Sequence, residues 1–227
     1  MPTTLTFEYT HSDELPPGHD NEVRTPDALV EHVLEAHTDV GDAVLDVFAG
    51  YGTTLTVAER LGRVPYGLEY EDERVAHVRD RLDAPDHVRQ GDVLTAPLSW
   101  MPPIDCCVTS PPFMERTNHR NPFENYDGGS SYEAYLDDVE TAFRRLDSVL
   151  AADGTVVVDV ANMKHEGRVT TLAWGVADRV AETFSFRGET VVNWTDPAES
   201  NTAANDRAGA FGYGYDHSYL LTFDVEK

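Results

Sequence analysis

Residues 109–113 read TSPPF and directly follow an apolar run, IDCCV, that is typical of a buried strand. Proline fixes its own φ near about −65° and restricts the residue before it, so Ser110 and the carbonyl of Pro111 would be held with little freedom. A hydroxyl oxygen and a backbone carbonyl held in this way can both accept hydrogen bonds from one amino group. The segment could therefore orient an amine and direct its lone pair at an electrophile.

A glycine-rich turn lies upstream, in VLDVFAGYGTT, where Gly50 and Gly52 stand between a predicted strand and a predicted helix. Glycine has no Cβ, so the backbone of such a turn can approach a bound ligand closely. Neither GxGxxG nor GxxxxGK[ST] is present, which argues against a dinucleotide site and against a phosphate loop. Taken alone, the turn is equally compatible with a tight strand-to-helix connection.

Acidic residues occur at or just past three successive predicted strands: Asp46, Glu69 and Asp92. In a doubly wound sheet these strand ends lie on one edge, beside the switch point where ligands bind. We expect Glu69 to hold ribose hydroxyls and Asp92 to accept from an adenine amino group. Because carboxylates would repel a pyrophosphate, the pattern predicts an adenosine ligand that carries no phosphate.

Apolar runs that alternate with helical patterns predict an α/β fold. We expect a mostly parallel sheet of seven strands with helices on both faces, ending in an antiparallel C-terminal hairpin. The predicted strands are 43–50, 64–70, 86–94, 104–110, 155–163, 186–194 and 215–225, and the predicted helices are 25–37, 53–62, 71–84, 132–154 and 170–183. Thr25 is expected to cap the first helix, with Pro26 in its first position.

The length of 227 residues predicts one domain, 1–227. Residues 1–24 form a polar leader, and 114–131 and 195–214 are long polar segments of the kind that carry function in compact domains. The acidic side chains of Asp137, Asp138 and Glu140 are expected on a solvated helix face.

The chain has 17 basic and 41 acidic residues, a formal net charge of −24, and only two lysines, Lys164 and Lys227. This balance indicates adaptation to molar salt, as in a halophile, where charge repulsion is screened within about 3 Å; an ordinary acidic cytosolic protein is the alternative. In high salt, counterion release contributes little to nucleic-acid binding, so the charge does not decide the class of partner.

Adjacent Cys106 and Cys107 lie within a predicted strand, where their side chains point to opposite faces, so we expect buried thiols and no disulfide. The N-terminus lacks the pattern of a signal peptide and no run approaches the roughly 18 apolar residues of a membrane span, which predicts a cytoplasmic protein. The nine histidines show no metal-binding spacing, so no metal is expected.

The stretch LDVFAGYGTTLTVAERLGRVPYGLEYEDERVAHVRDRL, followed by TSPPF, resembles the nucleic-acid amino-methyltransferases that use S-adenosylmethionine and act on cytosine N4 or adenine N6 of DNA. Their first motif is close to Asp-x-Phe-x-Gly-x-Gly-Thr-Thr, and RTPDALVEHVL resembles the helix that covers the methionine moiety. The resemblance implies a class I Rossmann-like methyltransferase fold and S-adenosylmethionine as cofactor, held by Thr25, Pro26, Asp46, Phe48, Ala49, Gly50, Gly52, Thr53, Thr54, Glu69 and Asp92.

The same resemblance implies that Ser110, Pro111, Pro112 and Phe113 form the catalytic motif. Ser110 Oγ and the Pro111 carbonyl would accept hydrogen bonds from the two N–H groups of the target amine. Phe113 would stack on the base after the base leaves a duplex. Serine in the first position favours cytosine N4, since aspartate or asparagine is usual for adenine N6.

The chain is smaller than is usual for sequence-specific enzymes of this family. As a result, only the two long polar segments could recognise a substrate. In the first of them, Arg116, His119, Arg120 and Phe123 are the candidate contacts to bases or backbone, although a solvated loop is the alternative. We expect a nucleic-acid substrate, DNA in preference to RNA. The other interpretations are an RNA amine methyltransferase, an adenine N6 DNA methylase and a non-catalytic subunit that binds the donor.

Overall fold

The computed structural model describes residues 2–12, 15–16, 24–165, 167–195 and 214–227. Its main sheet has the strand order β1-β9-β10-β6-β5-β2-β3-β4. The strands are β1 (Thr4–Glu8), β2 (Ala43–Asp46), β3 (Val64–Glu69), β4 (Val88–Gln90), β5 (Ile104–Thr109), β6 (Leu150–Val160), β9 (Ser185–Thr195) and β10 (His217–Asp224). A separate ribbon pairs β7 (Met163–His165) with β8 (Arg168–Thr170). The helices are α1 (Asp27–His37), α2 (Thr53–Arg60), α3 (Asp72–Arg79), α4 (Tyr132–Leu146) and α5 (Leu172–Ala181).

The strands from β2 to β6 pair in parallel, and β10 runs antiparallel between β6 and β9. The predicted parallel sheet with an antiparallel C-terminal hairpin is therefore confirmed. The predicted count of seven strands is wrong, because β1 adds an eighth strand from within the polar leader and pairs in parallel with β9. The hairpin consequently lies inside the sheet, one strand in from the edge.

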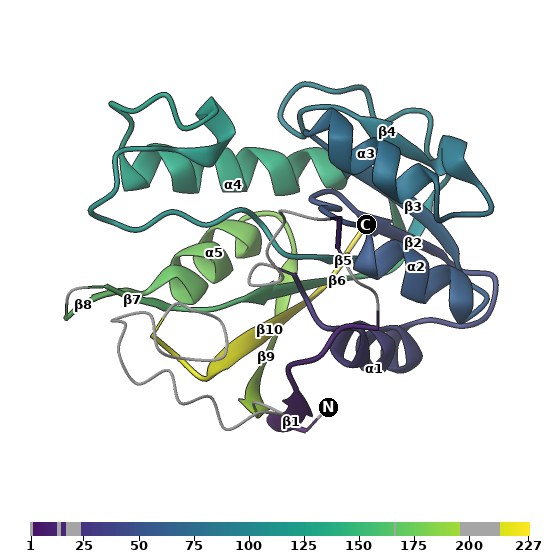
Figure 1. Ribbon diagram of the computed structural model, residues 1–227, viewed down its shortest axis with the longest axis horizontal. Coiled ribbons are helices and arrows are strands. Elements are labelled where there is room, and N and C mark those ends of the chain that lie inside the picture. The colour runs from purple at the N-terminus through teal and green to yellow at the C-terminus, as the bar shows by residue number, and fades with distance from the viewer. Residues whose placement is uncertain (1, 13–14, 17–23, 166, 196–213) are drawn as a thin grey trace.

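Helices cover both faces of the sheet, as predicted (Figure 1). Alternate residues of the central strands point to opposite faces, so one core packs against α4 and α5 and the other against α1 and α2. Cys107 belongs to the first core and Cys106 to the second, and both are buried free thiols. Burial raises the pKa of the Cys106 thiol to about 12, so it stays neutral. Among the described residues, no helix combines the length and apolarity needed to span a membrane.

Several predicted helix boundaries are wrong; the helix predicted at 71–84, for example, ends at Arg79. Pro26 is the N-cap of α1 rather than its first residue, because its ψ of 144° is extended, and Thr25 does not cap the helix. The predicted helix 132–154 ends at Leu146, and Gly154 lies inside β6. A Cβ on Gly154 would lie 3.2 Å from the carbonyl oxygen of Asp105, so glycine is needed there for close contact between β5 and β6, not for helix termination.

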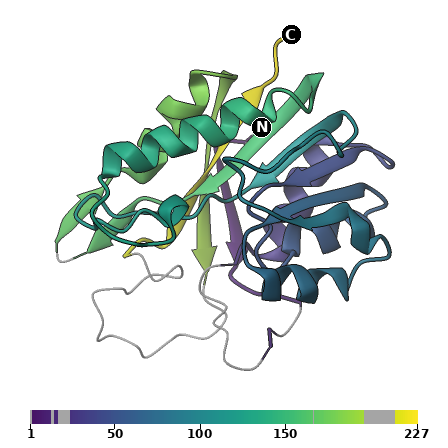
Figure 2. The same cartoon turned by 90° about the horizontal axis from the view of Figure 1, so that it is seen from above.

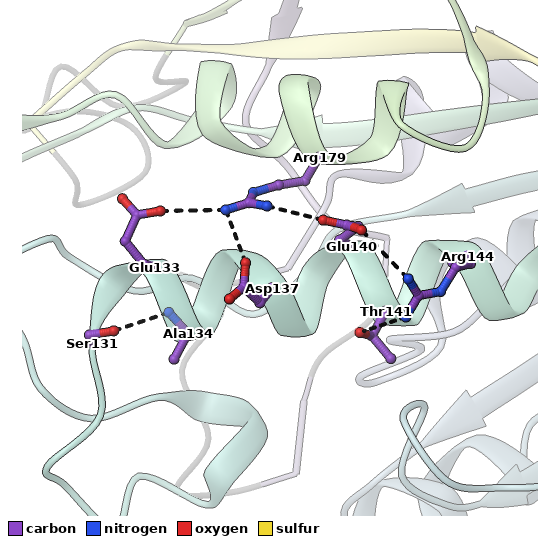
Figure 3. Close-up of polar contacts among 8 residues, drawn as sticks. All are labelled: Ser131, Glu133, Ala134, Asp137, Glu140, Thr141, Arg144 and Arg179. Atoms are coloured by element: carbon purple, nitrogen blue, oxygen red, sulfur yellow. Dashed lines mark hydrogen bonds and ion pairs between the residues drawn. The ribbon is translucent and has the colours of Figure 1, made fainter.

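Ion pairs join the two helices that cover one face of the sheet (Figure 3). Arg179 of α5 contacts carboxylates of Glu133 at 3.4 Å, Asp137 at 3.0 Å and Glu140 at 3.0 Å on α4. Asp137 is exposed, as the sequence predicts, whereas Asp138 and Glu140 are half-buried, and Asp137 and Glu140 are both paired with Arg179. The N-terminus of α4 is capped by Ser131, whose hydroxyl accepts from Ala134 N.

Candidate active site

A cavity of about 510 Å³ opens at the carboxyl ends of the parallel strands. An adjoining cavity of about 90 Å³ shares Thr25, Phe48, Gly50 and Ser110 with it. The sequence-predicted residues that line the larger cavity are Thr25, Phe48, Gly50, Glu69, Asp92, Ser110, Pro111, Pro112 and Phe113, and the smaller one adds Asp46, Ala49, Thr53 and Thr54. The glycine turn, the acidic residues and the SPPF segment, which together span residues 46–113 of the chain, therefore meet in one place.

The two glycines of the turn have different roles in the structure. Gly50, with φ of +54°, lines both cavities and leaves open space where a side chain would stand. Gly52 lines neither cavity. Its φ is +83°, it precedes α2, and a Cβ there would lie 2.8 Å from Val78 of α3. Gly50 thus keeps the ligand side of the turn open, whereas Gly52 allows two helices to pack closely.

Backbone donors hold the carboxylate of Glu69 at the cavity. Oε2 accepts from Gly50 N at 2.7 Å and Oε1 accepts from Glu71 N at 2.9 Å, with Arg74 at 3.8 Å from Oε1. Burial raises the pKa of this carboxyl, while the two backbone donors act in the opposite direction. The end of β3 is therefore tied directly to the glycine turn that follows β2.

Asp46 links the glycine turn to the SPPF segment. Its Oδ1 accepts from Phe48 N at 3.0 Å and from Thr109 Oγ1 at 2.6 Å, and Thr109 directly precedes Ser110. Burial raises the pKa of Asp46 to about 6, although these hydrogen bonds favour the ionised form. Asp92, which is half-buried, accepts from Leu94 N at 2.8 Å and so is oriented by its own turn.

The SPPF segment is anchored at its far end by α4. Buried Tyr135 donates its hydroxyl to the carbonyl of Pro112 at 2.9 Å, and burial raises the pKa of Tyr135 well above its usual range, so the phenol stays neutral. Within the described part of the chain, the carbonyl of Pro111 accepts no hydrogen bond. The Ser110 side chain is exposed to the cavity and Phe113 is 36% exposed beside it.

The cavity also has lining residues that the sequence analysis missed. Besides Phe123, which the sequence analysis proposes as a substrate contact, the segment 114–131 supplies Asn125 and Tyr126, which have positive φ values of 55° and 60°. Such backbone conformations in non-glycine residues often mark functional segments. The other lining residues missed include Arg24, Tyr70, Arg74, Asp159, Met163, Leu172 and Ser218. Of these, Asp159 carried a sequence signal, because it interrupts the apolar run VVVDV.

Of the four candidate substrate contacts, Phe123 lines the main cavity and the other three lie outside it. Arg116 lines a third cavity of about 340 Å³ together with Thr117, Met163 and residues 168–170, and its backbone N–H donates to Thr170 Oγ1 at 3.0 Å. His119, Arg120 and also Pro26 line none of these three cavities. In the segment 195–214, residues 196–213 lie outside the described residues.

Solved structures with the same architecture include methyltransferases. TrmN from Thermus thermophilus superposes with a TM-score of 0.58 at 16% identity, over 88% of this chain and 49% of that one. The glycopeptide N-methyltransferase MtfA, solved in complex with S-adenosyl-L-methionine, superposes with a TM-score of 0.55 at 15% identity, over 95% of this chain and 100% of that one. At these identities the likeness shows the fold, which is that of class I methyltransferases.

Sequence comparison identifies the family. The Type II methyltransferase M2.DpnII of Streptococcus pneumoniae is 46% identical over 59 residues, which cover 26% of this chain and only 22% of that protein. The family model N6_N4_Mtase, described as DNA methylase, matches residues 5–80 and 104–227, which is most of the chain. The protein therefore belongs to the N6_N4_Mtase family of DNA methylases.

Proposed function

We propose that the protein transfers a methyl group from S-adenosylmethionine to an exocyclic amine of a base in DNA, with cytosine N4 as the target. One observation carries this proposal: residues 110–113 line the same cavity as Gly50 and Glu69. Family membership supports the donor and the class of reaction. The reacting amine and the donor could thus lie side by side, as a methyl transfer requires.

The donor side of the cavity fits an adenosyl compound without phosphate. Gly50 leaves room for close approach, and Glu69 presents a carboxylate held by two backbone donors, whose remaining lone pairs can accept from ribose hydroxyls. Asp92 lies on the same cavity; its Oδ2 accepts only a long bond from Thr95 Oγ1, at 3.4 Å, and has lone-pair capacity left to accept from an adenine amino group. When bound here, S-adenosylmethionine supplies an electrophilic methyl group.

The acceptor side presents oxygens to an amine. Ser110 is exposed and lines the cavity, and the carbonyl of Pro111 is free of described partners, whereas the carbonyl of Pro112 already accepts from Tyr135. Each of two fixed acceptors would accept a hydrogen bond from one N–H group of an exocyclic amine. Together they would direct the lone pair of the nitrogen out of the base plane. Phe113, Phe123 and Tyr126 provide aromatic surface for an extruded base, where stacking contributes about 1–3 kcal/mol and offsets part of the cost of unpairing.

Cytosine is proposed because serine occupies the first position of the catalytic motif, as in the cytosine N4 enzymes that this segment resembles. DNA is proposed because the family is that of DNA methylases.

A path for the nucleic-acid strand is offered by the third cavity, which shares Met163 with the main one. Arg116 and Arg168 line it together with one acidic residue, Glu115. The exposed Arg168 side chain makes no ion pair or hydrogen bond with the described residues, and the Arg116 guanidinium only covers the ring of Tyr132 at 5.2 Å. In a chain of net charge −24, two such cations beside the active cavity support contact with phosphates that flank the target base.

The substrate can be tested directly. The protein is incubated in molar KCl with isotopically labelled S-adenosylmethionine and, in separate reactions, with DNA and with total RNA, and modified nucleosides are identified by mass spectrometry. We expect N4-methylcytosine in DNA. N6-methyladenine would replace the proposed base, and label in RNA alone would replace the proposed substrate.

A pair of serine variants tests the motif. Ser110→Ala should lower turnover by at least about a hundredfold while donor affinity, measured by calorimetry, changes little. Ser185→Ala, an exposed serine at the start of β9, is the matched control and should retain full activity. Normal turnover of Ser110→Ala would remove this residue from the reaction.

A further inference from the structure

Asp159 is a buried carboxylate at the carboxyl end of β6 that the proposed chemistry does not use. It is 6% exposed and lines the main cavity. In the register of β5 and β6, Val158 pairs with Thr109, so Asp159 follows in β6 as Ser110 follows in β5. The carboxylate therefore stands one strand away from the catalytic motif.

Its hydrogen bonds are fewer than those of the other buried acids of the site. Asp46 and Glu69 each accept from backbone N–H groups, whereas Asp159 accepts from no backbone N–H group: the Thr25 hydroxyl lies 3.4 Å from Oδ2, and the Ser218 hydroxyl is the other donor that interacts with this carboxylate. Its Oδ1 is buried and has no hydrogen-bond partner in the structure. No described cation forms a salt bridge with Asp159, and burial raises its pKa to about 6, although the hydroxyls of Ser218 and Thr25 act in the opposite direction.

A buried acceptor without a hydrogen-bond donor destabilises the folded protein. Such an acceptor is retained where a bound ligand supplies the donor. The missing partner must be a donor of N–H or O–H bonds, and a cationic or amino group suits a carboxylate best. The surroundings supply no amine from the described part of the chain. The ligands of the cavity do supply one: the methyl donor carries an α-ammonium group, and the target base carries an exocyclic amine.

We infer that Asp159 binds an amino group of a ligand inside the active cavity, through the oxygen that the protein leaves unpaired. The inference rests on the proposed function. The α-ammonium of the donor and the amine of the base share this chemistry, and binding experiments separate them. Asp159 contacts Thr25, which precedes α1, and lies one strand away from Ser110, so either ligand group is within the same part of the cavity.

The test uses the full chain and the isosteric variant Asp159→Asn. Donor-side binding is measured by calorimetry without nucleic acid, with three probes: S-adenosylmethionine, S-adenosylhomocysteine, and methylthioadenosine, which lacks the amino-acid part. If Asp159 binds the ammonium group, Asp159→Asn lowers the affinities for S-adenosylmethionine and S-adenosylhomocysteine by the same factor, at least about tenfold. The affinity for methylthioadenosine stays unchanged.

If Asp159 binds the base, the three donor-side affinities stay unchanged, and the KM for DNA rises or kcat falls at least about tenfold. The matched control is Asp178→Asn, an exposed acid of α5 that lines none of the three cavities. A variant that matches wild type in all of these measurements overturns the inference and leaves Asp159 a structural residue. Failure of the wild-type protein to methylate any nucleic acid would instead count against the proposed function.

Discussion

The hydroxyl of Tyr135 donates to the carbonyl of Pro112 at 2.9 Å, and this bond joins helix α4 to the segment that carries Ser110. At the other end of the segment, Thr109 donates to Asp46 at 2.6 Å. The proposed acceptor oxygens of Ser110 and Pro111 therefore lie between two side-chain anchors. The prolines restrict the local backbone, and the anchors fix where that backbone lies relative to the glycine turn.

Tyr135→Phe removes one anchor and keeps the ring. The Pro112 carbonyl loses its donor, which should cost about 1 kcal/mol of stability and loosen the acceptor geometry. We expect kcat to fall about tenfold with little change in donor affinity, as measured by steady-state kinetics and calorimetry. Tyr132→Phe serves as control, because the buried Tyr132 hydroxyl has no hydrogen-bond partner in the structure. Equal kcat values for Tyr135→Phe and wild type would show that the anchor is dispensable.

Gly52→Ala should destabilise the fold more than Gly50→Ala. At Gly52 a Cβ meets Val78 at 2.8 Å and φ is +83°, whereas at Gly50 the nearest atom lies at 3.8 Å. We expect a loss of about 2–4 kcal/mol for Gly52→Ala and about 1 kcal/mol for Gly50→Ala in urea unfolding. Adding Val78→Ala should cost less in the Gly52→Ala background than in wild type, and strictly additive losses would exclude the steric conflict.

Stability in the absence of donor should respond to the titration of Asp159. Its pKa is about 6 in the folded chain against an ordinary value of 3.8, so between these values the folded state binds more protons than the unfolded state. Stability from this group therefore falls as pH rises from about 4 to about 6. Burial lowers the pKa values of His11 and His37 to about 4, and these residues act in the opposite direction.

Asp159→Asn isolates the carboxylate from the histidines. The unfolding free energy of this variant relative to wild type should increase by about 2–3 kcal/mol between pH 4 and pH 7 and then stay constant. Urea unfolding at several pH values measures it. A difference that does not change with pH would contradict the raised pKa.

Arg168→Ala and Arg116→Ala should weaken DNA binding without changing donor affinity. Each variant removes one proposed phosphate contact. The slope of the logarithm of the DNA association constant against the logarithm of the salt concentration should therefore become smaller in magnitude by about 1 for each variant. Fluorescence anisotropy over a range of KCl concentrations measures this slope. Arg187→Ala is the control, because Arg187 is paired with Asp224. An unaltered slope in both test variants would move the DNA path elsewhere.

The net charge of −24 leads to a prediction about salt. Self-repulsion should destabilise the folded chain in dilute buffer, and molar KCl should screen it. We expect the thermal midpoint to rise by more than about 10 °C between 0.1 M and 2 M KCl. A midpoint that is independent of KCl would contradict adaptation to high salt.

The arrangement of helices around a parallel sheet was predictable from local pattern, because buried strands read as apolar runs and glycine marks the turn after Asp46. Strand β1 was not predictable. Its five residues alternate weakly in burial and are stabilised by pairing with β9, where Thr4 lies opposite Val191. A short edge strand of this kind depends on a partner that is distant in the chain, and no local pattern encodes that partner.

By itself, the sequence determined the chemistry available: SPPF with its rigid acceptors, the glycine turn, and an acidic residue at each of three strand ends. These depend on backbone restriction and side-chain type, which are local properties. The tertiary structure alone decided which carbonyl stays free, since Tyr135 donates to that of Pro112, and which buried acid keeps an unpaired oxygen, since Thr25 donates to Oδ2 of Asp159 and nothing described donates to its Oδ1. Contacts between residues 23 or 134 positions apart exist only once the sheet and α4 have assembled, so they cannot be read from spacing along the chain.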